Sequence, residues 1–261
     1  MSHLNPIFST GWLGPLPQIK KTDVVALAKS ARSIAELNEK IITCTACPRL
    51  VQWREEVAFV KRKAYRDEEY WGKPVTGFGS QQPRLMIIGL APGAHGANRT
   101  GRVFTGDASG DWLFGSLHRI GIAKIPTSVS PEDGQKLKHT RITTAVRCAP
   151  PDNAPDIYER DTCAPWLLRE CELAMPTVRA FVALGAFAWS ALFRTLRLLG
   201  HPLTPVKFGH GAQLIYRHEG VEYLLLASYH PSQQNTFTGK LTREQLDFLL
   251  EKAGRFAHAI N

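Results

Sequence analysis

Short apolar runs that alternate with helical stretches are the feature that most restricts how this chain can fold. Strand-like runs occur at residues 84–90, 142–147, 180–185, 213–217 and 222–229. Helical spacing of apolar residues covers 108–122, 156–174, 186–199 and, at the end, 242–257. Strands that alternate with helices favour a mainly parallel sheet with helices on both faces. We therefore expect an α/β fold, a three-layer α/β/α sandwich.

The first part of the chain has a different character. Residues 1–22 are rich in proline and glycine, and helical spacing then runs over 24–42 and 48–65. We expect an N-terminal extension at 1–30, a single domain at 31–261 and a helical arm ahead of the sheet. The second helical stretch and its end carry basic residues that would form one positive face, either solvated or in contact with DNA: Arg49, Arg54, Lys61, Arg62, Lys63 and Arg66.

The chain is basic, with a formal net charge of +9 and an estimated pI of 9.5. Such a balance is typical of a protein that meets a polyanion, although some proteins are simply basic. The first thirty residues lack the basic start and apolar block of an export signal. The longest apolar run, 180–193, is too short to cross a membrane. We expect a soluble, cytoplasmic monomer with no membrane partner, associated with the nucleoid if the source is bacterial.

The cysteines predict a metal site rather than disulfides. Their number is odd, no export signal precedes them, and Cys44 and Cys47 form a Cys-x2-Cys pair. Cys148 and Cys163 can supply a second pair from far along the chain, whereas Cys171 lies on a helical segment and fits a packed thiol. Because zinc and an iron–sulfur cluster both take four thiolates, the spacing leaves both open.

The stretch "RLMIIGLAPGAHGANRTGRVFTGDASG" (84–110) runs from a strand into a glycine-rich loop. It contains no lysine for a P-loop, and its glycines do not match the dinucleotide-binding fingerprint. In open sheets, ligands bind outside the carboxyl ends of the strands, where two further polar loops, "CAPPDNAP" and "HPSQQNTFTGK", also begin. These loops would gather an aromatic ring, amides, an acid and a histidine, a set suited to a flat polar ring: His95, Asn98, Arg99, Arg102, Phe104, Asp107, Asn153, His230, Ser232, Gln233, Gln234 and Asn235.

Taken in order, "GLAPGAHGANRTGRVFTGDASG", "TTAVRCAPPDN" and "SYHPSQQNTFTGKLT" resemble the motifs of the uracil-DNA glycosylase superfamily. The match is to family 5, the iron–sulfur enzymes of the UDGb type, and covers about residues 40–255. The resemblance implies the uracil-DNA glycosylase-like sandwich and a [4Fe-4S] cluster on Cys44, Cys47, Cys148 and Cys163. Cys171 lies outside that pattern.

The resemblance also implies that the glycine-rich loop holds a base turned out of DNA, because the bond to be cut lies inside the duplex stack. Phe104 is then the stacking surface, although a phenylalanine here could equally pack in the core. Gly89, Ala91 and Asn153 would complete the base pocket. We expect the remaining loop residues to contact DNA: Arg99, Arg102, Ser232, Gln233, Gln234, Asn235 and Lys240.

Cleavage of the glycosidic bond leaves positive charge on the sugar and negative charge on the base. A donor can stabilise the departing base, and a carboxylate can orient water and balance the sugar's charge. By the resemblance, His230 is the donor and Asp107 the carboxylate, with Asn153 and His95 as further catalytic candidates. Asp107 could instead cap a helix, or do both.

Two departures from related families bear on chemistry and specificity. Family-4 relatives carry a glutamate just after the strand's glycine, where this chain has apolar residues at 90–92. They also carry an asparagine that reads uracil, at the position where this chain has Thr144. Without that amide, discrimination should loosen. We expect activity on uracil and on other damaged bases such as hypoxanthine, ethenocytosine and hydroxymethyluracil.

These features predict a monofunctional DNA glycosylase without lyase activity, because no lysine is suitably placed for a Schiff base. Its partner would be DNA containing uracil or another damaged base. A non-catalytic iron–sulfur module that binds damaged DNA is the main alternative, and the missing acid keeps it open. An electron carrier is a third, to which the polar crevice is poorly suited.

Overall fold

The computed structural model describes residues 20–260. Its sheet has six strands in the order β1-β3-β2-β4-β6-β5. The strands are β1 (Phe78–Gly79), β2 (Leu85–Gly89), β3 (Thr140–Thr144), β4 (Ala180–Leu184), β5 (Gln213–His218) and β6 (Val221–Ser228). The four central strands are parallel, and the edge strands β1 and β5 pair antiparallel with β3 and β6. The expected mainly parallel central sheet is confirmed.

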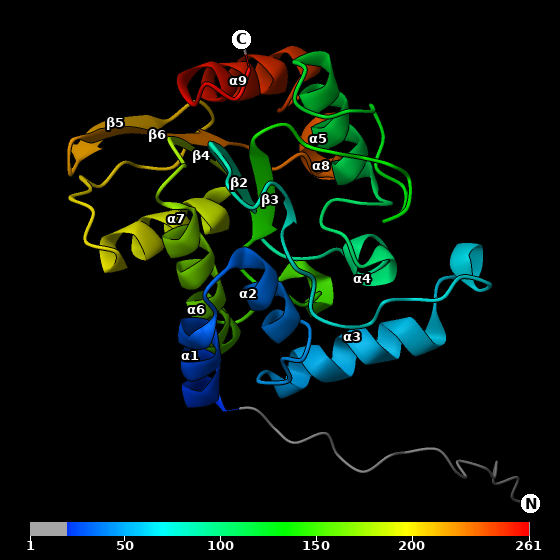
Figure 1. Cartoon of the computed structure of the whole chain (residues 1–261). Coiled ribbons are helices and arrows are strands. Elements are labelled where there is room, and N and C mark those ends of the chain that lie inside the picture. The colour runs from blue at the N-terminus through cyan, green and yellow to red at the C-terminus, as the bar shows by residue number, and fades with distance from the viewer. Residues whose placement is uncertain (1–19, 261) are drawn as a thin grey trace, which may run out of the picture.

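Helices cover both faces of the sheet, as Figure 1 shows. Helices α5 (Ala108–Arg119) and α9 (Arg243–Phe256) lie on one face, and α6 (Ile157–Ala174) and α7 (Ala186–Leu198) lie on the other. Alternate residues of β2 point to opposite faces: Leu85 and Ile87 pack with α5 and α9, whereas Met86 and Ile88 pack with α6 and α7. The three-layer sandwich follows from this alternation.

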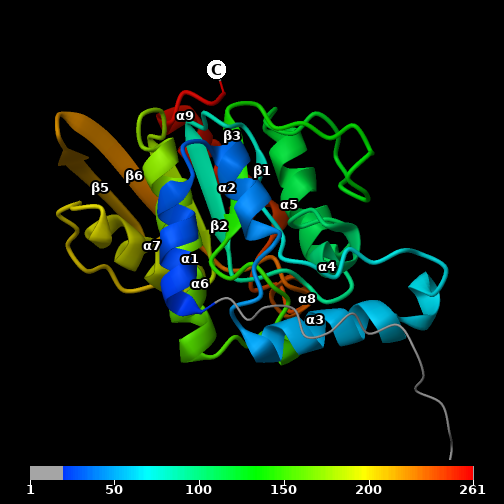
Figure 2. The same cartoon turned by 60° about the horizontal axis from the view of Figure 1, so that its bottom comes forward.

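The N-terminal arm consists of α1 (Lys21–Ser30), α2 (Ile34–Ile41), α3 (Pro48–Val60) and a 3-10 turn, η1 (Lys63–Tyr65). The helix expected over 24–42 is interrupted because Ser33 caps α2, its hydroxyl accepting from the amide of Glu36 at 3.2 Å. Helix α1 lies alongside α6 with Val24 and Ala28 buried (Figure 2). Of the predicted extension 1–30, residues 1–19 lie outside the described residues.

Short helices occur in the loops where the sequence predicted no regular structure. They are α4 (Ala97–Thr100), η2 (Pro151–Asn153) and α8 (Gln233–Phe237). Each follows the carboxyl end of β2, β3 or β6, where the polar crevice was expected. They are too short for apolar periodicity to reveal.

A buried ionic network fastens α6 to the sheet. The carboxylate of Glu170 on α6 accepts hydrogen bonds from Arg141 Nε on β3, at 2.5 Å, and from Arg147 Nη2, just beyond β3. Thr143 Oγ1 donates to the same carboxylate at 2.7 Å. Burial alone would raise the pKa of Glu170, but the charges of Arg147 and Arg141 outweigh it and bring the pKa to about 2.

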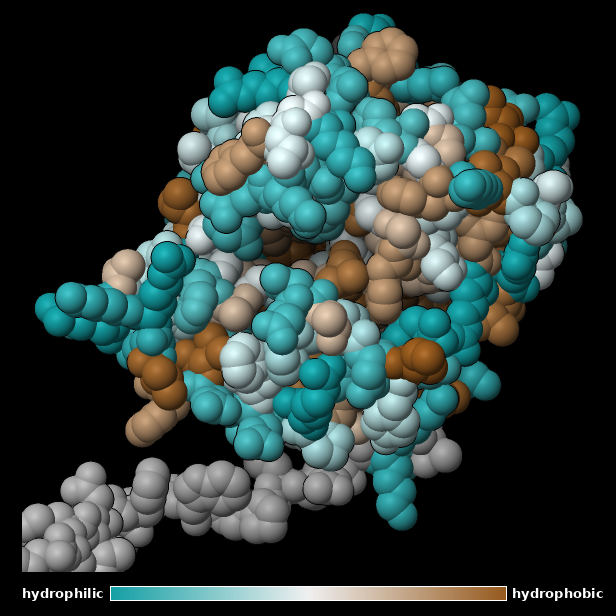
Figure 3. Space-filling model, turned by 180° about the vertical axis from the view of Figure 1, so that it is seen from behind, coloured by the Kyte–Doolittle hydropathy of each residue, from teal (hydrophilic) through white to brown (hydrophobic). Residues whose placement is uncertain are grey.

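Hydrophilic residues cover most of the face seen in Figure 3, around a hollow with a hydrophobic floor. Within residues 20–260, no helix has the length and apolar character needed to cross a bilayer.

Replacing Glu170 with glutamine should leave two buried guanidinium groups without a counter-charge. Breaking a buried pair in this way costs about 3–5 kcal/mol of the free energy of unfolding, measurable by urea denaturation. Glu172→Gln is the matched control, since the Glu172 side chain is 50% exposed and pairs with Arg169 on the same helix. An exposed pair is worth below about 1 kcal/mol. Equal losses in the two variants would contradict a structural role for the Glu170 network.

Candidate active site

Three loops meet at the carboxyl edge of the parallel sheet. Strands β2 and β3 are neighbours, whereas β4 separates β2 from β6. The loops nevertheless converge, because the rings of Phe104 and His230 lie 5.8 Å apart, centroid to centroid, at an angle of 28°. The loop after β2 and the loop after β6 therefore form one site.

Phe104 lies against the end of β2 and is only 7% exposed. Its φ of +51° is uncommon for a bulky residue and indicates that the surrounding loop fixes its conformation. Gly89 makes this packing possible, because a Cβ there would lie 2.7 Å from Phe104 Cζ. Phe104 thus packs on the end of the sheet, as the core reading of this residue predicted, and its ring faces His230.

Asp107 caps the N-terminus of α5. Its Oδ1 accepts from the amide of Gly110 at 2.9 Å, which is the capping role anticipated from the sequence. Its Oδ2 lies against Gly96, where a Cβ would come within 1.9 Å. Burial raises the pKa of Asp107, although the hydrogen bond from Gly110 opposes the shift. The carboxyl group is therefore shared between a helix cap and the glycine-rich loop.

His230 follows β6 and is held by its main chain. Asn235 Nδ2 donates to the carbonyl oxygen of His230 at 2.9 Å, which ties the histidine to α8. Burial lowers the pKa of His230 to about 4. The imidazole is consequently neutral near pH 7 and has one N–H to donate.

Arg99 holds the glycine-rich loop together from inside. Its Nε donates to the carbonyl oxygen of His95 at 2.8 Å and its Nη2 to that of Gly106 at 2.9 Å. The guanidinium also pairs with Glu68 and lies 3.9 Å from the centre of the Tyr65 ring. Since Arg99 is only 9% exposed, its predicted contact with DNA phosphate has no support in this arrangement.

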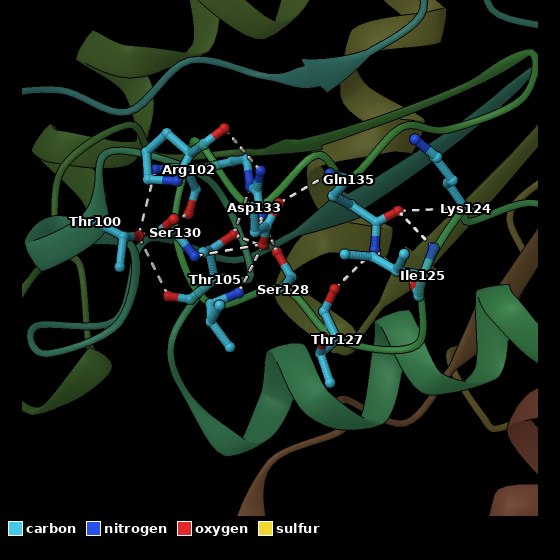
Figure 4. A network of polar contacts seen from close by, with 12 residues as sticks. Thr100, Arg102, Thr105, Lys124, Ile125, Thr127, Ser128, Ser130, Asp133 and Gln135 are labelled. Atoms are coloured by element: carbon cyan, nitrogen blue, oxygen red, sulfur yellow. Dashed lines mark hydrogen bonds and ion pairs between the residues drawn. The ribbon is translucent and has the colours of Figure 1, made fainter.

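Arg102 has a similar internal role, shown in Figure 4. It donates to Ser128 Oγ at 2.7 Å and Thr105 Oγ1 at 3.0 Å, and it pairs with Asp133 at 2.5 Å. Although burial opposes it, the hydrogen bond from Arg102 lowers the pKa of Asp133 to about 2. The network ties the segment around Ser128 to the loop that carries Phe104, and it leaves Arg102 too buried to serve as a surface contact.

The other predicted residues divide between the interior and the rim. Asn98 is fully buried, so it does not line the crevice as expected, and Ala91 packs among the apolar residues near the cysteines. His95 lies on the loop, its Nδ1 3.1 Å from Tyr70 Oη, and burial lowers its pKa. Four predicted residues are exposed: Asn153, Gln233, Gln234 and Lys240. Ser232 precedes α8 as its N-cap and is half-buried.

Two further residues of this region have features that only the structure shows. Thr144 pairs in register with Gly89, and its buried hydroxyl has no hydrogen-bond partner among the described residues. Phe237, on α8, is 77% exposed. The departure at Thr144 marked that position in the sequence, but nothing in the sequence indicated that Phe237 would be exposed.

Four cysteines line one small cavity at the other side of this region. Cys44 and Cys47 come from the turn before α3, Cys148 from the loop after β3 and Cys163 from α6. Two donors already serve the thiols: Arg54 Nη1 lies 3.0 Å from Cys148 Sγ, and the amide of Arg147 lies 3.2 Å from Cys163 Sγ. Cys171, also on α6, is not among the lining residues. It is fully buried in the core between this helix, α7 and the sheet.

The cavity is also bordered by buried donors without partners. Arg54 Nε, Arg147 Nε, Thr162 Oγ1 and Trp166 Nε1 have no hydrogen-bond partner among residues 20–260, and all four residues line it. Because buried donors are nearly always satisfied, this set indicates an acceptor in the cavity.

The spacing and protonation of the four thiols bear on which metal group they could hold. Zinc requires four sulfur atoms about 2.3 Å from one centre. In the described part of the chain, no three histidine, cysteine or acidic side chains come close enough to hold a single metal ion. Burial raises the pKa of Cys47 to about 12, and neighbouring thiols add to the shift, so cationic iron or zinc would be needed to keep the sulfurs ionised. The unpartnered donors around the four thiols fit a group that carries hydrogen-bond acceptors.

Comparison with known proteins agrees with this geometry. The family model described as uracil DNA glycosylase superfamily matches residues 76–254. The chain belongs to this superfamily. A type-5 uracil-DNA glycosylase of Mycobacterium bovis is 55% identical over 88% of this chain and 84% of its own length. The type-5 enzyme of Thermus thermophilus is 50% identical over 84% of this chain and 96% of its own.

Identities to type-5 and type-4 members of the superfamily indicate the group to which the chain is more similar. A type-5 uracil-DNA glycosylase of Pyrobaculum aerophilum is 45% identical over 82% of this chain, whereas a type-4 enzyme of the same organism is 29% identical over 76%. The chain thus groups with the type-5 members, which confirms the resemblance drawn from the motifs and the expected class of enzyme, a DNA glycosylase.

The depressed pKa of His230 predicts how the protein responds to acid. Between pH 6.5 and about 4 the unfolded chain binds a proton at His230 that the folded protein does not, so the free energy of unfolding should fall as the pH falls through this window. His201, whose pKa burial also lowers to about 4, acts in the same direction. Histidine ring NMR signals, assigned with His230→Gln and His201→Gln, should titrate with midpoints near 4. A midpoint near 6.5 for His230 would show that its ring is solvated.

Proposed function

We propose that this protein excises uracil from DNA, gripping the everted base in the crevice at the carboxyl edge of the sheet and hydrolysing its N-glycosidic bond to leave an abasic site. The observation that carries the proposal is the contact between the rings of Phe104 and His230, from two loops, with Asp107 on the same loop as Phe104, in a chain whose relatives are named uracil-DNA glycosylases.

The base rests on Phe104 in this proposal. The Phe104 ring, packed against the end of β2, offers a fixed stacking surface, and every nucleobase has an aromatic face that can stack on it. Thr144, with its unpartnered hydroxyl beside Gly89, supplies a polar contact at the floor. Asn153 adds an amide from the loop after β3. One hydroxyl discriminates less than a bidentate amide, which supports a broader range of bases.

His230 stabilises the leaving group. As the bond between C1′ and the base nitrogen breaks, the bonding electrons move onto the base, and its oxygen becomes anionic. A neutral imidazole with one N–H is a hydrogen-bond donor there throughout the physiological pH range. The carbonyl oxygen of His230, held by Asn235, fixes the position from which the ring donates.

Asp107 acts on the sugar side. When ionised, its Oδ2 can orient water toward C1′ and offset the positive charge that develops there. The glycine-rich loop admits this oxygen because Gly96 has no side chain. The acid missing after β2 is thus replaced from the start of α5 in this proposal.

Helix α8 and the residues after it face the duplex in this proposal. Gln233, Gln234 and Phe237 are exposed on this short helix, directly after His230. Polar and apolar side chains of this kind occupy the space that an extruded base leaves in the stack. Lys240, whose ammonium lies 4.5 Å from the centre of the Tyr229 ring, is placed to meet a flanking phosphate.

The four cysteines hold a [4Fe-4S] cluster in our proposal. Each of Cys44, Cys47, Cys148 and Cys163 would supply one thiolate ligand, and the cluster would offer sulfide acceptors to the unpartnered donors around the cavity. Held there, it would join α3 and α6 to the loop after β3.

A panel of oligonucleotides with a single damaged base tests the substrate range. We expect release of uracil, and of at least one of hypoxanthine, ethenocytosine and hydroxymethyluracil, each leaving an alkali-sensitive abasic site. A base that is more weakly paired in the duplex should be released faster. Thr144→Val, which keeps the shape and removes the hydroxyl, should reduce release of all of them. Release of uracil alone, with every other lesion untouched, would contradict the broad range, and no base loss at all would favour a non-catalytic DNA-binding module.

Variants of the two catalytic residues separate chemistry from binding. Asp107→Asn keeps a side chain that can cap α5, so the fold should persist while single-turnover release slows. His230→Gln should slow release by about 10²–10³, as expected for one oxyanion donor. Binding to the uracil oligonucleotide, measured by fluorescence anisotropy, should stay within a few-fold of wild type. If Asp107→Asn releases uracil at the wild-type rate, its carboxylate serves only the helix.

A further inference from the structure

Arg54 occupies an unusual position on α3. The sequence placed it on a positive surface face, but it is 3% exposed and points into the cysteine cavity. Its Nη1 lies 3.0 Å from Cys148 Sγ and 3.2 Å from the carbonyl oxygen of Cys44, while Nη2 lies 3.7 Å from Glu55. One guanidinium therefore contacts both halves of the cysteine set, from before α3 and from after β3.

The main chain of the same residue contacts the catalytic loop. Asn98 Nδ2 donates to the carbonyl oxygen of Arg54 at 3.2 Å, and Asn98 is fully buried. The main-chain amide of Asn98 donates to the carbonyl oxygen of Gly93 at 3.0 Å. The next residue, Arg99, donates to the carbonyl oxygen of Gly106 further along the same loop. Figure 1 shows α3 running along the molecule next to α4, which carries Asn98.

We propose that Arg54 is a positioning residue that couples the cysteine site to the catalytic loop, its guanidinium holding Cys148 and Cys44 and its main-chain carbonyl holding Asn98. The inference rests on the proposed function, because it takes the four cysteines to carry the iron–sulfur cluster. Through this link, the turn of α3 that contains Arg54 is fixed on one side by the cluster ligands and on the other by the loop that places Asp107.

The chemistry of the position requires arginine. Five N–H donors on a rigid plane serve a sulfur, a carbonyl and a further acceptor together, whereas a lysine offers one point charge. The unpartnered Nε of Arg54 is available to that further acceptor, which a cluster sulfide would provide. Hydrogen bonds to cluster sulfurs raise the reduction potential, so Arg54 should also set the potential of the cluster.

Arg54→Gln tests the contact between Arg54 and the cysteine site. Arg66→Gln is the matched control, because it removes the same charge from a side chain that is 71% exposed. In anaerobically purified protein, iron and sulfide content and visible absorbance report the cluster directly. We expect Arg54→Gln to lose the cluster about 10–100-fold faster in air than wild type and to shift its midpoint potential to a more negative value. Arg66→Gln should match wild type in both measurements.

Asn98→Leu tests the contact between Arg54 and the catalytic loop. It removes the bond to Arg54 without touching the cysteines, so cluster absorbance, stability in air and potential should stay as in wild type. Single-turnover release of uracil should fall at least tenfold, with substrate affinity changed less than the rate, because the loop that carries Asp107 loses its anchor. A wild-type rate in Asn98→Leu overturns the coupling.

The outcomes separate the inference from the proposal beneath it. Wild-type protein without iron and sulfide would refute the cluster itself. Iron and sulfide in wild type, together with an Arg54→Gln variant that keeps the decay rate and potential of Arg66→Gln, would refute the role of Arg54 alone. If Arg54→Gln does not fold, Arg54→Lys decides: a decay rate between those of wild type and a Cys148→Ser variant supports the link, and a wild-type decay rate overturns it.

Discussion

The carboxylate of Glu170 holds two guanidinium groups, one on β3 and one just beyond it, and this interaction places α6 against the sheet. Cys163 lies two turns earlier on α6, and Cys148 directly follows Arg147. When Glu170 binds Arg147, it therefore brings the two cysteines to the same cavity, where the amide of Arg147 reaches Cys163 Sγ. The cost of burying these charges is met by their mutual pairing.

The segment from Thr143 to Asn153 adjoins both the cysteine cavity and the loop after β2. Within a few residues it contains Thr144 beside Gly89, Arg147 bound to Glu170, the cavity-lining Cys148 and the exposed Asn153. Because β3 pairs with β2, the same segment lies beside the loop that presents Phe104 and Asp107. The cysteine cavity and the loop after β2 thus both adjoin the end of β3. Arg54 contacts the cavity through its guanidinium and Asn98 of that loop through its main-chain carbonyl.

Periodicity and motif spacing were sufficient to predict the sandwich and the parallel core, since these depend on patterns local to each element. They also marked the two loops whose Phe104 and His230 lie ring to ring. They were insufficient for side chains whose role depends on distant partners. Arg99 and Arg102 read as surface cations, yet Glu68 and Asp133 bury them. Asn98 read as a crevice amide, yet it bonds to the main chain of α3. The break before α2 depends on one serine cap within an otherwise continuous helical pattern.

The bracing of the glycine-rich loop has a consequence for how lesions are found. Arg99 closes the loop from His95 to Gly106, and Arg102 fastens it to the neighbouring segment, so the slot is already shaped before any nucleotide arrives. A preshaped slot has little conformational entropy left to lose on binding. In the proposed reaction the selective step would then lie with the nucleic acid, since a weakly paired nucleotide leaves its helix more often and would be captured more often.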